Sequence, residues 1–92
     1  MQAIAEIQVI PLGVGTSVRT WVKRAHEMIV ESGLEVELHA MGTNVEGDLA
    51  AILDVVRRLH ETLHADGVPR ISTAIKLGTR TDKAPSLAAK RL

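Results

Sequence analysis

Two stretches of this chain show the same succession of hydrophobicity patterns, and this repeat constrains the fold more than any other feature of the sequence. Each stretch begins with a segment in which apolar and polar residues alternate. A segment with apolar residues at helical spacing follows, then a glycine, then a second segment of alternating apolar and polar residues. The glycine motifs are Ser-Gly-Leu at 32–34 and Asp-Gly-Val at 66–68. The pattern predicts two successive strand–helix–strand units. A chain of 92 residues has room for one such domain, residues 1–92.

The periodicity gives the expected elements. Alternation predicts strands over residues 3–10, 35–41, 43–46 and 70–78. Helical spacing predicts one helix from a cap at Thr16 or Ser17 to Gly33, and another over 48–65. The apolar stripe of the second helix is expected to comprise Leu49, Ile52, Leu53, Val56, Leu59 and Leu63.

Proline and glycine residues mark the expected ends of these elements. We expect Pro11 to end the first strand, and Gly47 to form the break at which the second helix starts. Gly33 and Gly67 are expected to stop the two helices. Residues 85–92 predict a short C-terminal helix with Pro85 in its first turn.

Two strand–helix–strand units joined by a hairpin predict an α+β fold, the ferredoxin-like βαββαβ sandwich. This fold has a four-stranded antiparallel sheet in the order 4-1-3-2 with both helices on one face. The open face would then mix apolar and charged side chains, among them Ile4, Glu6, Glu37, His39 and Lys76. Such a face is too apolar for pure solvent surface, so we expect a homodimer or homotetramer formed through it.

Composition excludes several classes of function. Eleven Lys and Arg balance eleven Asp and Glu, so no long-range attraction to nucleic acid or to an anionic membrane is expected. The chain has no cysteine, which removes disulfides and thiolate metal sites and suits the cytoplasm. No window approaches the ~18 apolar residues of a membrane span. Trp21 is the one aromatic residue, so an RNA-binding sheet that stacks bases on several rings is not expected.

Residues 60–64, His-Glu-Thr-Leu-His, match the zinc-binding pattern H-E-x-x-H. In that pattern two imidazoles one helical turn apart bind the metal, and a third ligand and a substrate cleft complete the site. Here Leu59 and Leu63 are expected to face the core. We therefore interpret His60 and His64 as flanking residues near the end of the helix and predict no metal site.

Two further segments could bind a ligand. The glycines of residues 11–17 and the helix start at Thr16 and Ser17 could hold an anion through backbone N–H groups, or form an ordinary turn. We expect the first and third strands to be the central parallel pair, so that Glu46 would meet this loop and Arg70 at one edge of the sheet. The alternative is that Glu46 caps the second helix and Thr43 stabilises a turn. No nucleophile with a base is among these residues, so we predict no catalytic site.

The chain resembles the small thiamine-binding proteins of the YkoF-like superfamily over nearly its whole length. Residues 41–47, Met-Gly-Thr-Asn-Val-Glu-Gly, carry the most specific part of the resemblance. The opening strand with its Pro-x-Gly turn, residues 32–34 and the segment 70–76 are also similar. The chain departs from the family at Val36, where relatives usually have Tyr, and at Ala40, where they usually have Pro.

The resemblance implies a ferredoxin-like fold, paired dimers or tetramers, no catalysis and no cofactor. It also implies binding of thiamine or of its hydroxymethylpyrimidine half. A carboxylate such as Glu46 could engage the aminopyrimidine, and the other ligand residues we expect are Thr43, Thr16, Ser17, Met41, Arg70 and Trp21. The expected function is a cytoplasmic, non-enzymatic thiamine carrier or sensor. The alternative is a structural or regulatory homo-oligomerisation module without a small-molecule ligand.

Overall fold

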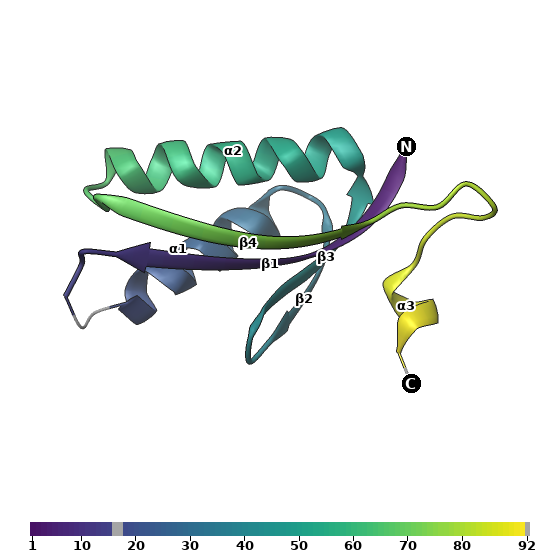
Figure 1. Cartoon of the computed structure of the whole chain (residues 1–92), viewed down its shortest axis with the longest axis horizontal. Coiled ribbons are helices and arrows are strands. Elements are labelled where there is room, and N and C mark those ends of the chain that lie inside the picture. The colour runs from purple at the N-terminus through teal and green to yellow at the C-terminus, as the bar shows by residue number, and fades with distance from the viewer. Residues whose placement is uncertain (16–17, 92) are drawn as a thin grey trace.

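The computed structural model describes residues 1–15 and 18–91. Its elements are β1 (Gln2–Leu12), α1 (Val18–Glu31), β2 (Glu35–His39), β3 (Gly42–Asp48), α2 (Leu49–Ala65), β4 (Arg70–Gly78) and α3 (Leu87–Lys90). The four strands form one antiparallel sheet in the order β2-β3-β1-β4 (Figure 1). The predicted ferredoxin-like α+β fold is confirmed, including the strand order and the short C-terminal helix.

The central pair of the sheet is antiparallel, so the expectation of parallel first and third strands is wrong. Ile4 lies opposite Glu46 in the β1–β3 ladder and opposite Gly78 in the β1–β4 ladder. The reason is topological. A hairpin reverses the chain between β2 and β3, and the helical crossover through α1 makes β2 parallel to β1. β3 must therefore run against β1.

β1 continues through Pro11, where we expected it to end. The carbonyl of Met1 accepts the N–H of Leu49, with an N···O distance of 2.8 Å. Because successive residues of a strand point their polar groups to opposite sides, the odd-numbered residues of β1 face β3. The pairing with β3 stops at Ile7. The missing N–H of Pro11 therefore costs no ladder hydrogen bond, and proline is tolerated in the strand.

β3 includes Gly47, which we expected to break the chain before the second helix. A Cβ atom at Gly47 would lie 2.3 Å from Cδ2 of Leu34, so the glycine permits a close approach. α2 begins one residue later, after Asp48, whose carboxylate accepts the N–H of Ala50 at 3.1 Å. Asp48, and not Glu46, is therefore the N-cap of α2.

α1 and α2 cover one face of the sheet and bury the core. The buried apolar residues are Ala3, Ala5, Ile7, Ala25, Ile29, Val45, Ile52, Val55, Leu59, Leu63 and Val68. The predicted stripe of α2 is wrong at one place, because Val55 is buried and Leu53 is 49% exposed. The buried stripe runs through Ile52, Val55 and Leu59, and Leu53 lies about 100° further around the helix.

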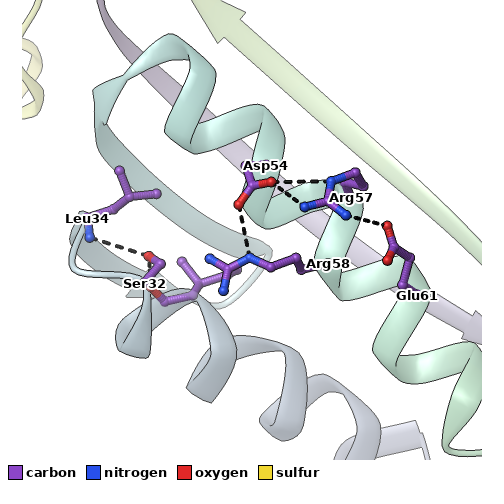
Figure 2. A network of polar contacts seen from close by, with 7 residues as sticks. Ser32, Leu34, Asp54, Arg57, Arg58 and Glu61 are labelled. Carbon is purple, nitrogen blue, oxygen red and sulfur yellow. Dashed lines mark hydrogen bonds and ion pairs between the residues drawn. The ribbon is translucent and has the colours of Figure 1, made fainter.

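The outer surface of α2 carries a polar network made within the helix itself. Arg57 bridges Asp54 and Glu61, with N···O distances of 2.5 and 2.7 Å, and Arg58 also contacts Asp54 at 3.1 Å (Figure 2). These pairs are three or four residues apart, the spacing of neighbours on a helix. No helix of the described residues is long and apolar enough to cross a membrane.

The C-terminal segment returns to the open face of the sheet, which is therefore partly covered by the chain itself. Pro85 is buried, and the hydroxyl of Ser86 caps α3. The N–H of Leu87 donates to Oε1 of Glu46 at 2.7 Å. α3 thus lies at the end of the sheet where β1 begins, away from the loop that follows β1 (Figure 1).

Candidate functional site

The two ladders on β1 end at different places, and this leaves a notch in the sheet. β3 pairs with β1 as far as Ile7, opposite Thr43, whereas β4 pairs with β1 as far as Leu12. Residues 8–12 therefore have a strand on one side only. The turn of the β2–β3 hairpin, at Ala40 and Met41, lies beside this unpaired length of β1.

A cavity of about 290 Å³ fills the notch between β1, α1 and the hairpin. This volume is at the lower end of the ~300 to 1,000 Å³ that small-molecule sites occupy. Its lining consists of Ile7, Gln8, Val9, Ile10, Pro11, Val18, Val22, Ala25, His26, Ile29, Leu38, His39, Ala40, Met41, Gly42 and Thr43. The walls are thus mainly apolar, with a few polar side chains among them.

The backbone of Val9 supplies a donor and an acceptor at this cavity. Val9 is an odd-numbered residue of β1, so its N–H and C=O face the notch, as those of Met1 face β3. Among the described residues, neither group has a backbone partner on that side. Free strand edges of this kind bind groups that offer a matching donor and acceptor.

Two polar side chains meet at the floor of the cavity. Thr43 is 5% exposed, and its hydroxyl lies 3.5 Å from Nδ1 of the half-buried His26. β3 directs Thr43 toward the helices, and α1 places His26 opposite it. The contact is at the upper limit of a hydrogen bond, so both side chains retain capacity for a further partner.

Exposed apolar side chains surround the mouth of the cavity. Leu38 is 60% exposed, Met41 is 67% exposed and Val22 is 44% exposed. Val18 and Ile10 complete this rim with smaller exposed fractions. Apolar residues gathered around one opening are typical of a ligand-binding groove or an interface.

The open face of the sheet carries a second polar region next to the cavity. Nε2 of His39 lies 3.1 Å from Oδ1 of Asn44 and 3.3 Å from Oε2 of Glu6. Nδ2 of Asn44 donates to Oε1 of Glu37 at 3.2 Å, and Nε of Arg91 donates to Oε2 of Glu37 at 2.7 Å. These contacts join three strands to the C-terminal segment.

Three carboxylates on this open face, those of Glu35, Glu37 and Glu46, have pKa values that differ with their partners. A hydrogen bond from Arg91 lowers the pKa of Glu37 below its ordinary value. Glu35 and Glu46 lie opposite each other in the β2–β3 ladder and interact. The hydrogen bond between their carboxyl groups, followed by charge repulsion, raises the pKa of Glu35. The same hydrogen bond, together with the N–H of Leu87, lowers the pKa of Glu46.

Among the described residues, two of the predicted ligand residues come together at the cavity. Thr43 and Met41 line the cavity. Glu46 lies at the opposite end of β1, beside Ile4, because β3 is antiparallel to β1. The expected meeting of Glu46 with Arg70 is therefore wrong, since Arg70 pairs with the last residue of β1.

The remaining predicted residues fall elsewhere. Trp21 is half-buried and packs against the core cluster. Thr16 and Ser17 lie outside the described residues. Of the two departures from the family pattern, Ala40 lines the cavity, whereas Val36 pairs with Val45 and is not among the lining residues.

The histidines of the H-E-x-x-H pattern make contacts within the protein. Nε2 of His60 lies 2.7 Å from the hydroxyl of Thr73 on β4, and Nδ1 of His64 lies 2.8 Å from the carbonyl oxygen of Val68. These contacts tie α2 to β4 and to the loop before it. Within residues 1–15 and 18–91, no three His, Cys, Asp or Glu side chains are placed to hold a metal ion.

The sequence patterns do not identify Val9, His26 or His39 as residues of a cavity. The lone histidine in the middle of the first predicted helix, next to Ala25, was a usable signal, since it lies beside the buried stripe. Nothing in the sequence indicates which residues of β1 lack a partner. That depends on where the hairpin turns relative to β1.

Residues 5–91 match the family described as thiamine-binding protein. The UPF0045 protein of Synechocystis is 41% identical over 90 residues, which cover 98% of this chain and 74% of that relative. The UPF0045 protein MJ1052 of Methanocaldococcus jannaschii is 40% identical over 89 residues, which cover 97% of this chain and 88% of the relative.

Solved structures agree with these relationships. The crystal structure of MJ1052 superposes with a TM-score of 0.88 at 39% identity, covering 97% of this chain and 91% of that one. A Bacillus cereus domain of unknown function also has a TM-score of 0.88, at 30% identity, covering 98% of this chain and 86% of that one. The chain therefore belongs to the thiamine-binding protein family.

Proposed function

We propose that this protein binds thiamine, or its hydroxymethylpyrimidine half, in the cavity at the notch of the sheet. It acts there as a non-catalytic cytoplasmic carrier or sensor. Membership of the thiamine-binding protein family over residues 5–91 supports the ligand class. The cavity supports the place, because it is the pocket in which unpaired backbone groups and a buried polar side chain lie together.

The single observation that carries the proposal is the backbone of Val9. An aminopyrimidine has an amino N–H donor beside a ring nitrogen that accepts. The C=O and N–H of Val9 offer the complementary pair on the notch side of β1. A planar ring in this position would extend the sheet as a strand does, and its remaining polar atoms would lie near Thr43 and His26.

The rest of the ligand would contact the apolar rim. A cavity of about 290 Å³ accommodates one ring with its substituents, so a second ring would lie at the mouth. There Leu38 and Met41 provide exposed apolar surface, and a thioether makes favourable contacts with aromatic rings. The phosphate groups of thiamine diphosphate would find no Lys or Arg among the lining residues. We therefore expect thiamine to bind more tightly than its diphosphate.

The polar pair in the cavity supports binding rather than catalysis. A hydroxyl nucleophile is activated by a base at about 2.6 to 3.2 Å. The hydroxyl of Thr43 and Nδ1 of His26 are 3.5 Å apart. Their geometry suits two groups that each bind a ligand atom.

Isothermal titration of chelator-treated protein with thiamine, hydroxymethylpyrimidine and thiamine diphosphate tests the proposal. Thr43→Val removes the hydroxyl at nearly constant shape and should weaken binding about three- to tenfold, the equivalent of one hydrogen bond. Val9→Pro removes the N–H that faces the cavity without removing a ladder hydrogen bond, and it should weaken binding further.

Glu46→Ala is the matched control, because Glu46 is half-buried on the open face and does not line the cavity. It should keep saturable thiamine binding, weakened at most about fivefold, because it loses only the acceptor that anchors the N–H of Leu87. If Glu46→Ala abolished binding while Thr43→Val left it unchanged, the ligand would lie on the open face and the cavity would be the wrong site.

The alternative function is a homo-oligomerisation module without a ligand. Ile75 and Leu77 favour it, since both are about 40% exposed on β4, an edge strand of the sheet. Light scattering after size exclusion measures the assembly. A stable oligomer that gives no heat with any of the three ligands would favour this alternative over the binding protein.

A further inference from the structure

A directed chain of hydrogen bonds runs from the tip of the β2–β3 hairpin across the open face. The N–H of Met41 donates to Nδ1 of His39 at 3.3 Å. A ring that accepts at Nδ1 carries its proton on Nε2. Nε2 lies 3.1 Å from Oδ1 of Asn44, so this contact is a donation from His39 to Asn44. The order of donors fixes both the histidine tautomer and the orientation of the Asn44 amide, and Oε2 of Glu6, 3.3 Å from the same Nε2, is a second acceptor for its proton.

The chain continues to the C-terminal segment. Nδ2 of Asn44 donates to Oε1 of Glu37 at 3.2 Å, and Nε of Arg91 donates to the other oxygen of the same carboxylate at 2.7 Å. Arg91 is brought to this place by a second anchor, the 2.7 Å hydrogen bond from the N–H of Leu87 to Glu46. The last described residue of the chain is thus linked to the mouth of the cavity.

The hairpin tip has few buried apolar contacts beyond the β2–β3 ladder, which ends at His39 and Gly42. Leu38 and Met41 are 60% and 67% exposed, and Ala40 is also exposed. Segments with few buried apolar contacts open more readily than the core does. Beyond the backbone ladder, polar contacts such as that between Met41 and His39 therefore help to hold the tip, and the tip forms one wall of the cavity.

We propose that Arg91 is a positioning residue of the binding cavity, which it influences by holding Glu37, Asn44 and His39 in the order that fixes the hairpin tip. This proposal rests on the proposed function, since it assigns the C-terminal segment to the same site. It implies that docking of this segment and binding of the ligand favour each other by the same factor. A carrier or sensor would gain from it a binding signal on the opposite face of the sheet.

The experiment compares Arg91→Gln and Arg91→Lys with the unaltered full-length chain. Long-range 1H–15N spectra of the ligand-free protein report the tautomer of His39, and amide exchange reports the Met41 N–H. Arg91→Gln should convert the single His39 tautomer into a mixture and speed exchange at Met41. It should also weaken thiamine binding about two- to fivefold, as expected for one exposed ion pair. Arg91→Lys keeps the charge and should restore much of the effect.

Arg80→Gln is the matched control, because Arg80 lies in the same C-terminal segment but pairs with Asp82 at 2.6 Å. It should change none of the three readouts. An unchanged His39 tautomer and unchanged Met41 exchange in Arg91→Gln would overturn the proposal. The ligand-free spectra decide this even if the unaltered protein binds no thiamine, a result that would contradict the proposed function alone.

Discussion

The two faces of the sheet are held by different kinds of interaction. Among the described residues, the core between this face and the helices α1 and α2 contains eleven buried apolar residues and one buried polar residue, Thr43. The open face carries charged and polar side chains, and its contacts join residues far apart in the chain, such as Glu37 with Arg91 and Glu46 with Leu87. Packing therefore maintains the fold on one face. Polar contacts arrange the C-terminal segment and the hairpin on the other.

The position of the cavity follows from this difference. It lies at the boundary of the two faces, with Thr43 and His26 on the helix side and His39 on the open side. A binding site at such a boundary can be changed from the open face without loss of the core. The following substitutions test how separate the two faces are.

The largest effect is expected in the core. Leu59 is fully buried, and Leu59→Ala should lower the free energy of unfolding by about 2 to 5 kcal/mol, through lost burial and a residual cavity. Urea denaturation measures this change. Leu53→Ala is the control on the same helix, since Leu53 is 49% exposed and should lose no more than about 0.5 kcal/mol. Equal losses at the two positions would contradict the assigned core.

A smaller effect is expected where the C-terminal segment is anchored. Glu46→Ala removes the acceptor for the N–H of Leu87 and should speed amide exchange at Leu87 at least tenfold, while unfolding changes little. The free energy of unfolding should fall by less than about 1 kcal/mol, because the contact is only half-buried. A loss as large as that of a core substitution would show that the open face also maintains the fold.

The interaction between Glu35 and Glu46 predicts that the free energy of unfolding depends on pH. The raised pKa of Glu35 means that stability increases as the pH falls from 7 through that pKa towards its ordinary value of 4.5. The lowered pKa of Glu46 means that this residue stabilises the folded state above pH 4.5. That stabilisation is lost as the pH falls through the lowered pKa. Glu35→Gln should therefore raise the urea midpoint at pH 7 slightly and remove the gain between pH 7 and 4.5.

Urea denaturation at several pH values between 3 and 7 measures the stability of the unaltered protein and of Glu35→Gln as a function of pH. Below the pKa of Glu46, the unaltered protein and Glu35→Gln should lose stability together. A gain on acidification that persisted in Glu35→Gln would assign the effect to another group.

The smallest effect is expected at the network on the outside of α2 (Figure 2). Arg57 contacts Asp54 and Glu61 on the exposed face of α2, and such local pairs contribute little in water. Arg57→Gln should leave the urea midpoint within experimental error, in contrast to the long-range contacts of the open face. A clear shift of the midpoint would mean that this network also supports the packing of α1 on α2.

Much of the fold could be predicted because its signals are local. Gly33 and Gly67 have φ angles of +83° and +109°, and both end a helix as expected. Strand β4 has the predicted bounds, 70–78, since alternation marks its whole length. Gly47 misled the prediction because its role is a close approach to Leu34, a residue 13 positions earlier in the chain.

The candidate site could be predicted only in part. Residues 41–47 were identified as the informative segment, and Thr43 and Met41 do line the cavity. Glu46 was expected to face the same ligand. The position of Glu46 in the sheet depends on the direction of β3 relative to β1, and the alternation of apolar and polar residues does not reveal that direction.

The sequence by itself determined the elements, their order and the apolar faces of the helices, because periodicity and helix caps act within a few residues. Only the tertiary structure decided that the pairing of β1 with β3 stops at Ile7 while its pairing with β4 continues to Leu12. It also decided that Val9 is left with a free edge and that Arg91 reaches Glu37. These features depend on register and on contacts between distant segments. Register is set by the packing of the whole sheet against its helices, and no single segment encodes it.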